Sequence, residues 1–235
     1  MKTICAAICE SFTPPPPDVQ LVAFAGDEPD AIRARVSTDF LDRASAYAAE
    51  RQVYLVPGLY IRQNALALCL LDDRGNRVIE QEATHLNRSW AGDLRRGDDV
   101  KVAELPFGRV TLCVDVDIYK SEVLRIAALQ GAEIVVNCQY LRSEDDCREM
   151  ILAGAWQQAQ QNCVYILNAT SRHASILGPC EAAADRSGFL TQPSTAYPVQ
   201  AELSAEKRAA AYQDFPVFKS LNPALYRRHA GELCQ

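Results

Sequence analysis

Short apolar runs of strand length alternate with helical stretches along most of this chain, and this alternation constrains the fold more than any other feature. The apolar runs cover residues 3–8, 19–24, 53–55, 65–71, 110–114, 134–137 and 164–168. Residues 40–51, 121–130 and 145–161 instead repeat apolar side chains at helical spacing. This order predicts an α/β protein.

A predicted tight turn decides between a purely parallel β-sheet and mixed β-sheets. The sequence from Asp72 to Asn76 carries two aspartates and Gly75, a composition typical of a turn between adjacent antiparallel strands. Mixed sheets are therefore favoured over a three-layer Rossmann-type sheet. The chain has no GxGxxG after an early strand and no GxxxxGK[ST], so nucleotide binding of those kinds has no support.

The bulk properties indicate one domain over residues 1–235. No Ser/Gly-rich linker or internal repeat divides the 235 residues. A net charge of −6 with scattered basic residues argues against nucleic acid and against anionic lipid as partners. The apolar start is interrupted by Glu10, and no run approaches the ~18 apolar residues of a membrane span. We expect a cytoplasmic protein.

The cysteines and histidines are not arranged as ligands. None of the nine cysteines has CxxC spacing, which is typical of reduced, mostly buried thiols. Only His85, His173 and His229 could supply imidazole, and none lies in a zinc-like cluster. We expect no metal and no cofactor, and a structural role for His85.

The stretch after residue 107 resembles the nucleophile region of the nitrilase, or carbon–nitrogen hydrolase, superfamily. In that family a glycine opens an apolar strand, a Cys-aromatic-Asp step ends it, and a glutamate, an arginine and a Gly-Ala follow. The positions that fall on this spacing are Gly108, Asp117, Glu122, Arg125, Gly131 and Ala132. Weaker matches to the family lie on both sides of this stretch and in the family's order. Upstream they are Val56-Pro57-Gly58 and Thr84-His85-Leu86, and downstream the match is the Pro223-Ala-Leu-Tyr226 ending.

The resemblance implies a four-layer αββα sandwich with two mixed β-sheets. It also implies an active site in which a glutamate acts as general base, a lysine stabilises the oxyanion and a cysteine attacks the carbon of an amide or nitrile. These types suit the chemistry, because a thiolate is a strong nucleophile and a cation offsets the charge of the tetrahedral intermediate.

This chain departs from the family at all three positions. In the family's register the glutamate position is Gly26, the lysine position is Ala83 and the cysteine position is Asp115. Asp27 lies one residue too late, and such a shift turns a strand side chain to the opposite face. The resemblance therefore implies a catalytically inactive pseudo-enzyme that binds a small ligand or a partner.

An active amidohydrolase with a rearranged site stays open as the alternative. It would cleave a non-peptide C–N bond with Cys113, reached by sliding the register two residues, or with Asp115 as nucleophile. The ordinary interpretation of Cys113 is a small buried hydrophobe. We expect Asp117, Cys138 and Asn64 to line the pocket in either case.

The connection after the first strand departs from the family as well. Residues 14–17 are four consecutive prolines, which cannot form helix interior, so the family's first helix is missing. The sheet face under that helix would be bare, and a partner chain could cover it. Family members also pair sandwich to sandwich with their C-terminal tails. We therefore expect a homodimer or a higher oligomer, with the tail of residues 204–235 used in dimerisation.

Overall fold

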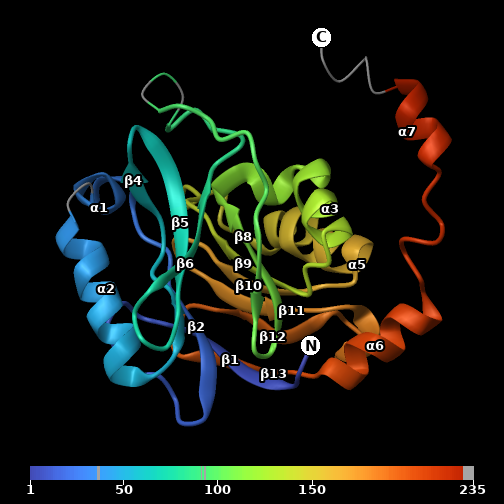
Figure 1. The fold of residues 1–235 in the computed structure, drawn as a ribbon, viewed down its shortest axis with the longest axis horizontal. Coiled ribbons are helices and arrows are strands. Elements are labelled where there is room, and N and C mark those ends of the chain that lie inside the picture. The colour runs from blue at the N-terminus through green and yellow to red at the C-terminus, as the bar shows by residue number, and fades with distance from the viewer. Residues whose placement is uncertain (36–37, 91, 93, 230–235) are drawn as a thin grey trace.

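The computed structural model describes residues 1–35, 38–90, 92 and 94–229, and it contains two mixed β-sheets packed face to face (Figure 1). In the first sheet β1 and β2 are parallel, as are β2 and β3, while the other pairs are antiparallel. Its seven strands are, in order, β13 (Val199–Leu203), β1 (Ile4–Cys9), β2 (Val19–Phe24), β3 (Tyr54–Val56), β5 (Ala65–Leu71) and β4 (Tyr60–Arg62), with β6 (Arg77–Glu82) also paired to β5.

The second sheet has a parallel centre and antiparallel edges. β8, β9 and β10 run parallel, and the remaining pairs are antiparallel. The order of its six strands is β12 (Phe189–Ser194), β11 (Ala174–Leu177), β10 (Tyr165–Ala169), β9 (Ile134–Cys138), β8 (Gly108–Val114) and β7 (Val102–Leu105). Functional side chains are expected where the parallel strands end, because their carboxyl ends meet at one edge.

Helices cover the outer face of each sheet, which completes the four layers (Figure 1). On the first sheet lies α2 (Thr38–Arg51), while α1 (Pro29–Ala34) packs beside β4 and buries Ile32 in the central core. On the second lie α3 (Ser121–Leu129), α4 (Arg148–Ile151) and α5 (Gln157–Asn162). The sequence predicts one helix over 145–161; the structure begins it at Arg148 and inserts a π-helical turn, Leu152–Trp156, between α4 and α5.

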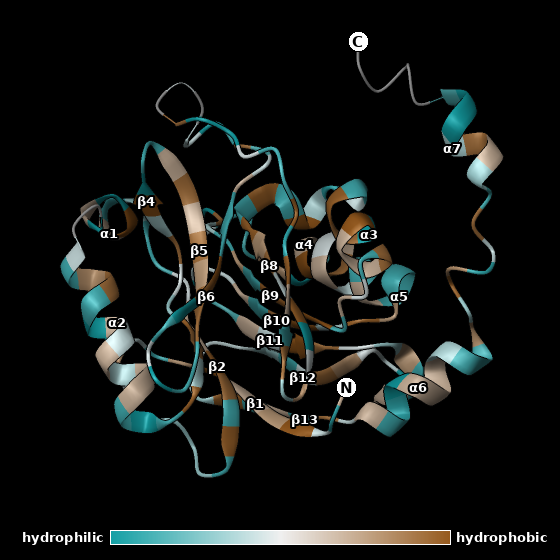
Figure 2. Cartoon of the chain, viewed as in Figure 1, coloured by the Kyte–Doolittle hydropathy of each residue, from teal (hydrophilic) through white to brown (hydrophobic). Residues whose placement is uncertain are grey.

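The strand periodicity decides which side chains enter the central core. On β8, Leu112 and Val114 point into the core between the sheets, while Cys113 packs under the helices on the outer face. On the opposite side of the molecule α2 places Phe40 and Ala44 against the first sheet. Figure 2 shows this helix banded in hydrophobic and hydrophilic residues, as an amphipathic helix should be.

The family's first helix is absent, as the four prolines predict. Residues 10–18 form a loop that joins β1 directly to β2. Phe12 in this loop covers part of the sheet, with its ring 5.1 Å from that of Phe24 and 6.1 Å from that of Tyr47.

The face beside that loop is not the bare apolar surface that the missing helix led us to expect. Its outward positions on β13 are the exposed Gln200 and Glu202, and Cys5 of β1 is half-buried. Among the described residues, the exposed large apolar side chains all lie elsewhere: Val78, Ile126, Leu129, Phe215, Leu225 and Tyr226. This sheet face therefore needs no covering helix, because its outward residues are partly polar and Phe12 of the loop covers part of the rest.

The C-terminal segment leaves the body of the molecule. α6 (Ala205–Asp214) follows β13 and buries Ala211 against Cys163 and Val217. α7 (Pro223–His229) has no buried residue and stands away from the sandwich (Figure 1). No helix in the described part of the chain is long and apolar enough to cross a membrane.

Candidate functional site

Asp115 forms a sharp elbow at the carboxyl end of β8. The strand ends at Val114, and Asp115 begins a 3₁₀ turn, Asp115–Tyr119. Its φ is +55°, in the left-handed region that residues other than glycine adopt rarely. Strained backbone of this kind concentrates at functional sites, because the surrounding structure must hold it in place.

The carboxyl group of Asp115 is completely buried and is held by two donors. One oxygen, Oδ1, accepts a hydrogen bond of 3.0 Å from the backbone N–H of Tyr140, which follows β9. The other, Oδ2, accepts one of 2.8 Å from the side-chain amide of Asn87. Burial raises the pKa of Asp115 from 3.8 to about 7, although the hydrogen bond from Tyr140 opposes the shift.

Asp117, two residues on, is a buried acceptor that clamps the segment after β6. It accepts hydrogen bonds from the backbone N–H and hydroxyl of Thr84, each 2.8 Å, and from the backbone N–H of His85 at 2.9 Å. The Nδ1 of His85 lies 2.9 Å from the same carboxylate, and its Nε2 lies 3.6 Å from Glu122. His85 thus has two acidic neighbours, which its spacing in the sequence did not indicate. Burial raises the pKa of Asp117.

Gly26, at the glutamate position of the resemblance, has no room for a side chain. Its N–H donates to the carbonyl oxygen of Thr170 at 3.1 Å, and a Cβ on Gly26 would lie 2.2 Å from that oxygen. The turn after β10 therefore fills the space that a longer side chain at position 26 would need. The nearest acid, Asp27, is instead ion-paired with Arg35.

Ala83, at the lysine position, lies in the core between the sheets. Its side chain is fully buried, and its N–H donates 2.8 Å to the carbonyl of Leu66. It directly precedes Thr84, so Asp117 ties this position to the elbow. The structure thus places Ala83 beside the site, where it contributes neither a base nor a cation.

The two cysteines singled out in the sequence are both fully buried. Cys113 is fully buried on the outer face of β8, and burial, together with Asp117 and Asp115, raises its pKa well above the ordinary value. Cys138 ends β9 inside the central core, and burial raises its pKa to about 12. Neither environment favours a thiolate.

Asn64 lies apart from this group. It is exposed in the turn between β4 and β5, with φ at +63°, and its carbonyl accepts a hydrogen bond from Arg95. It is not among the residues that line the cavity at the elbow, and neither are Asp117 and Cys138, the other two residues expected to line the pocket.

That cavity, about 470 Å³, opens beside the elbow. Three of its lining residues adjoin Asp115: Asn87, Val116 and Tyr140. Arg142, paired to Asp145 at 2.7 Å, lies on its rim. The described residues contain no cluster of three or more His, Cys, Asp or Glu side chains that could hold a metal ion.

A third buried carboxylate, Asp146, hydrogen-bonds the turn that faces Gly26, and the sequence did not indicate it. Asp146 accepts hydrogen bonds of 2.6 Å from the hydroxyl of Thr170 and of 2.9 Å from the backbone of Arg172, and it lies 3.0 Å from Nδ1 of His173. This network fixes the turn whose backbone occupies the space at Gly26. The residues are more than twenty positions apart, so only the tertiary structure reveals the contact.

The architecture and the elbow define a class of fold, the nitrilase-type αββα sandwich. No family model and no curated protein sequence matches the chain. Solved structures do match. Nit3 of Saccharomyces cerevisiae, a member of branch 10 of the nitrilase superfamily, aligns with a TM-score of 0.77 at 15% identity over 93% of this chain and 96% of its own.

Two enzymes align over similar lengths. A carbon–nitrogen hydrolase of Helicobacter pylori has a TM-score of 0.75 at 16% identity and covers 96% of this chain and 97% of its own. An amidase of Nesterenkonia sp. has a TM-score of 0.71 at 16% identity, with coverage of 96% and 95%. The predicted fold is thus confirmed: this chain has the fold of the nitrilase superfamily.

Proposed function

We propose that this protein is a catalytically inactive member of the nitrilase-fold class that binds a small polar molecule in the cavity beside Asp115. The observation that carries the proposal is the close approach of Thr170 to Gly26, where a Cβ would lie 2.2 Å from a carbonyl oxygen. A glutamate base cannot occupy that position without displacing the turn after β10.

The chemistry of the elbow supports the same conclusion. The carboxyl group of Asp115 itself accepts the N–H of Tyr140 and the amide of Asn87. Those donors are therefore already engaged and do not await a developing oxyanion. Ala83 offers no cation in place of the family's lysine.

The ligand is best sought among small amides and carboxylic acids. A crystal structure of a Nesterenkonia amidase mutant contains butyramide, which makes this amide a suitable first probe. The side chains of Tyr140 and Arg142 line the cavity and offer donors that match an amide or carboxyl group.

The test combines binding with turnover. Butyramide is titrated into the protein by calorimetry, and ammonia release is measured in parallel with a nitrilase-fold amidase as positive control. We expect saturable binding, weakened by Asp115→Ala, and no ammonia above the uncatalysed rate. Ammonia release that disappears with Asp115→Ala or Cys113→Ala would overturn the proposal and support the rearranged amidohydrolase.

The rearranged enzyme has one favourable observation, the pKa of Asp115 near 7, which suits a general acid or base at neutral pH. Cys113 has none, since its thiol is fully buried and its pKa is raised. Thiol labelling at neutral pH separates the two alternatives: slow reaction at every buried cysteine supports the inactive protein, and fast reaction at Cys113 contradicts it.

We also propose that two copies associate through the C-terminal segment rather than through the face beside the prolines. The polar Gln200 and Glu202 give that face no apolar character to offer a partner. Leu225 and Tyr226 of α7, by contrast, are 55% and 58% exposed. A hollow of about 840 Å³ between α3, α5 and this segment could receive the tail of a second copy.

A further inference from the structure

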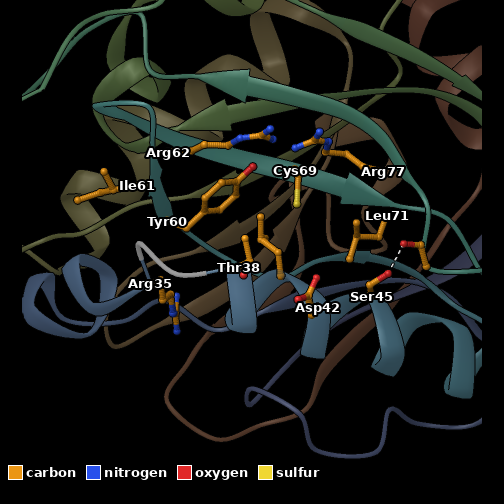
Figure 3. A pocket seen from close by; sticks show the side chains of 12 residues that line it. Arg35, Thr38, Asp42, Ser45, Tyr60, Ile61, Arg62, Cys69, Leu71 and Arg77 are labelled. Carbon is orange, nitrogen blue, oxygen red and sulfur yellow. Dashed lines mark hydrogen bonds between the residues drawn. The ribbon is translucent and has the colours of Figure 1, made fainter.

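A second cavity lies on the outer face of the first sheet, between α2 and strands β4 and β5 (Figure 3). Its volume is about 330 Å³, within the range of small-molecule sites. Strand β4 contributes Tyr60 and Arg62, β5 contributes Cys69, β6 contributes Arg77, and α2 contributes Asp42. This cavity is built from other elements than the elbow at Asp115.

Two arginines form a positive pole on the strand side. Arg62 and Arg77 each donate one hydrogen bond through Nη1 to the same oxygen of Glu80, at 2.8 and 2.7 Å. Tyr60 donates to that oxygen as well, at 2.6 Å. One carboxylate thus faces two guanidinium groups, which leaves one positive charge uncompensated.

Both arginines have N–H donors that are not used by any residue the structure describes. Within the described part of the chain, Nε and Nη2 of Arg62 and Arg77 have no hydrogen-bond partner. Both side chains are only partly exposed, 38% and 40%, and Figure 3 shows their guanidinium groups pointing toward each other at the cavity rim. Paired guanidinium groups of this kind suit a carboxylate, which accepts several N–H donors at once.

The helix side supplies the opposite charge through Asp42, because Arg35, which also lines the cavity there, is already ion-paired with Asp27. Asp42 is exposed on α2 and has no ion-pair or hydrogen-bond partner among the residues that the structure describes. Between the two poles the cavity has apolar walls, formed by Leu41, Cys69 and Leu71. Burial raises the pKa of Cys69 to about 12, so this wall is uncharged at neutral pH.

We propose that this cavity binds a small zwitterion, an α-amino acid with an apolar side chain. Its carboxylate would take the unused donors of Arg62 and Arg77, its ammonium group would face Asp42, and its side chain would lie on Leu71 and Cys69. A simple anion fits less well because Asp42 repels it, and a simple cation is repelled by the arginines.

Calorimetric titration of the full chain with L-leucine and two truncated analogues tests the charge pattern. 4-Methylpentanoate lacks the ammonium group, and 3-methylbutylamine lacks the carboxylate. We expect L-leucine to bind with a Kd of about 1 mM or tighter and each analogue to bind about tenfold more weakly or worse. Equal binding of L-leucine and 4-methylpentanoate would contradict the zwitterion site.

Site-directed variants test whether L-leucine binds in this cavity. Arg77→Gln should weaken L-leucine about tenfold, and Asp42→Asn should weaken L-leucine while leaving 4-methylpentanoate unchanged or tighter. Arg186→Gln is the control, because Arg186 does not line the cavity, is 75% exposed and lies 3.8 Å from Glu181.

Two further results would overturn the inference. One is the absence of saturable binding up to about 50 mM L-leucine. The other is binding that Asp115→Ala removes and Arg77→Gln preserves, since the ligand would then occupy the cavity at the elbow. That second result would leave the proposed function at Asp115 intact.

Discussion

Asp115 combines a left-handed backbone with a carboxyl group that no solvent reaches. Such a group is costly to ionise, because the protein supplies two hydrogen bonds where water would supply more. The cost appears as the pKa of about 7. Asp115 should therefore also make the free energy of unfolding depend on pH.

The contribution of Asp115 to the stability of the protein should fall as the pH rises from about 4 to about 7. In this window the unfolded chain releases the Asp115 proton near its ordinary pKa of 3.8, while the folded chain retains it. The folded state thus binds more protons, and the free energy of unfolding decreases by up to about 4 kcal/mol. Urea unfolding of the wild type and Asp115→Asn at several pH values measures the difference.

Between about pH 4 and pH 7, the free energy of unfolding of Asp115→Asn should rise relative to that of the wild type. Above about pH 7 the difference between the two proteins should stay constant. Asp117 is present in both proteins, and its charge is, after burial, one of the causes that raise the pKa of Asp115. A difference that stays constant over the whole range would show that Asp115 ionises normally.

Gly26→Ala should destabilise the protein by about 3 kcal/mol. The new Cβ would lie 2.2 Å from the carbonyl oxygen of Thr170, and backbone cannot yield as a flexible side chain can. Thermal and urea unfolding check this. Gly92→Ala is the control for backbone strain alone, because its φ is +96° and its Cβ would meet no atom within 4 Å; it should cost about 1 kcal/mol.

The loop of residues 10–18 is the element that adapts this chain to the loss of a helix. Phe12 sits among Phe24, Phe40 and Tyr47 with edge-to-face geometry, and the Tyr47 hydroxyl donates 2.6 Å to the carbonyl of Thr13. One aromatic side chain and one hydrogen bond thus anchor a proline-rich connection that has no regular structure of its own.

Phe12→Ala should therefore lower the free energy of unfolding by about 2 kcal/mol, since it opens a gap above Phe24. Phe215→Ala provides the matched control, because Phe215 is 65% exposed and its removal should change stability little. Denaturant unfolding of both variants gives the comparison. Equal effects would mean that the loop does not cover the sheet as the contacts indicate.

At the scale of the whole molecule, the sandwich is complete, while α7 at the C-terminal end is not packed on it. α7 has no buried residue, and the exposed Leu225 and Tyr226 lie on it. An apolar surface carried on a projecting helix suits association with a second copy.

Light scattering at micromolar concentration should give the mass of a dimer, about twice 25.9 kDa, or of a larger assembly. The double variant Leu225→Asp with Tyr226→Asp should shift the protein toward the monomer, because charged side chains oppose burial. Val78→Asp, on the exposed face of β6, is the control and should leave the mass unchanged. A wild-type monomer would contradict the proposed interface.

The sequence by itself was sufficient to predict the layered architecture of this protein. Strand and helix periods, the turn at Gly75 and the four prolines act through local backbone geometry, and the structure has the two mixed sheets and the missing helix that they predict. The order of weak motifs likewise predicted the nitrilase fold.

Only the tertiary structure decided what surrounds each position. Nothing in the sequence indicated that Thr170 fills the space at Gly26, that Asn87 and Tyr140 hold Asp115, or that Asp117 binds His85. These contacts join residues far apart in the chain, and their energies depend on packing and burial rather than on local conformation. For the same reason Asn64, near the expected pocket by resemblance, lies in an exposed turn of the folded molecule.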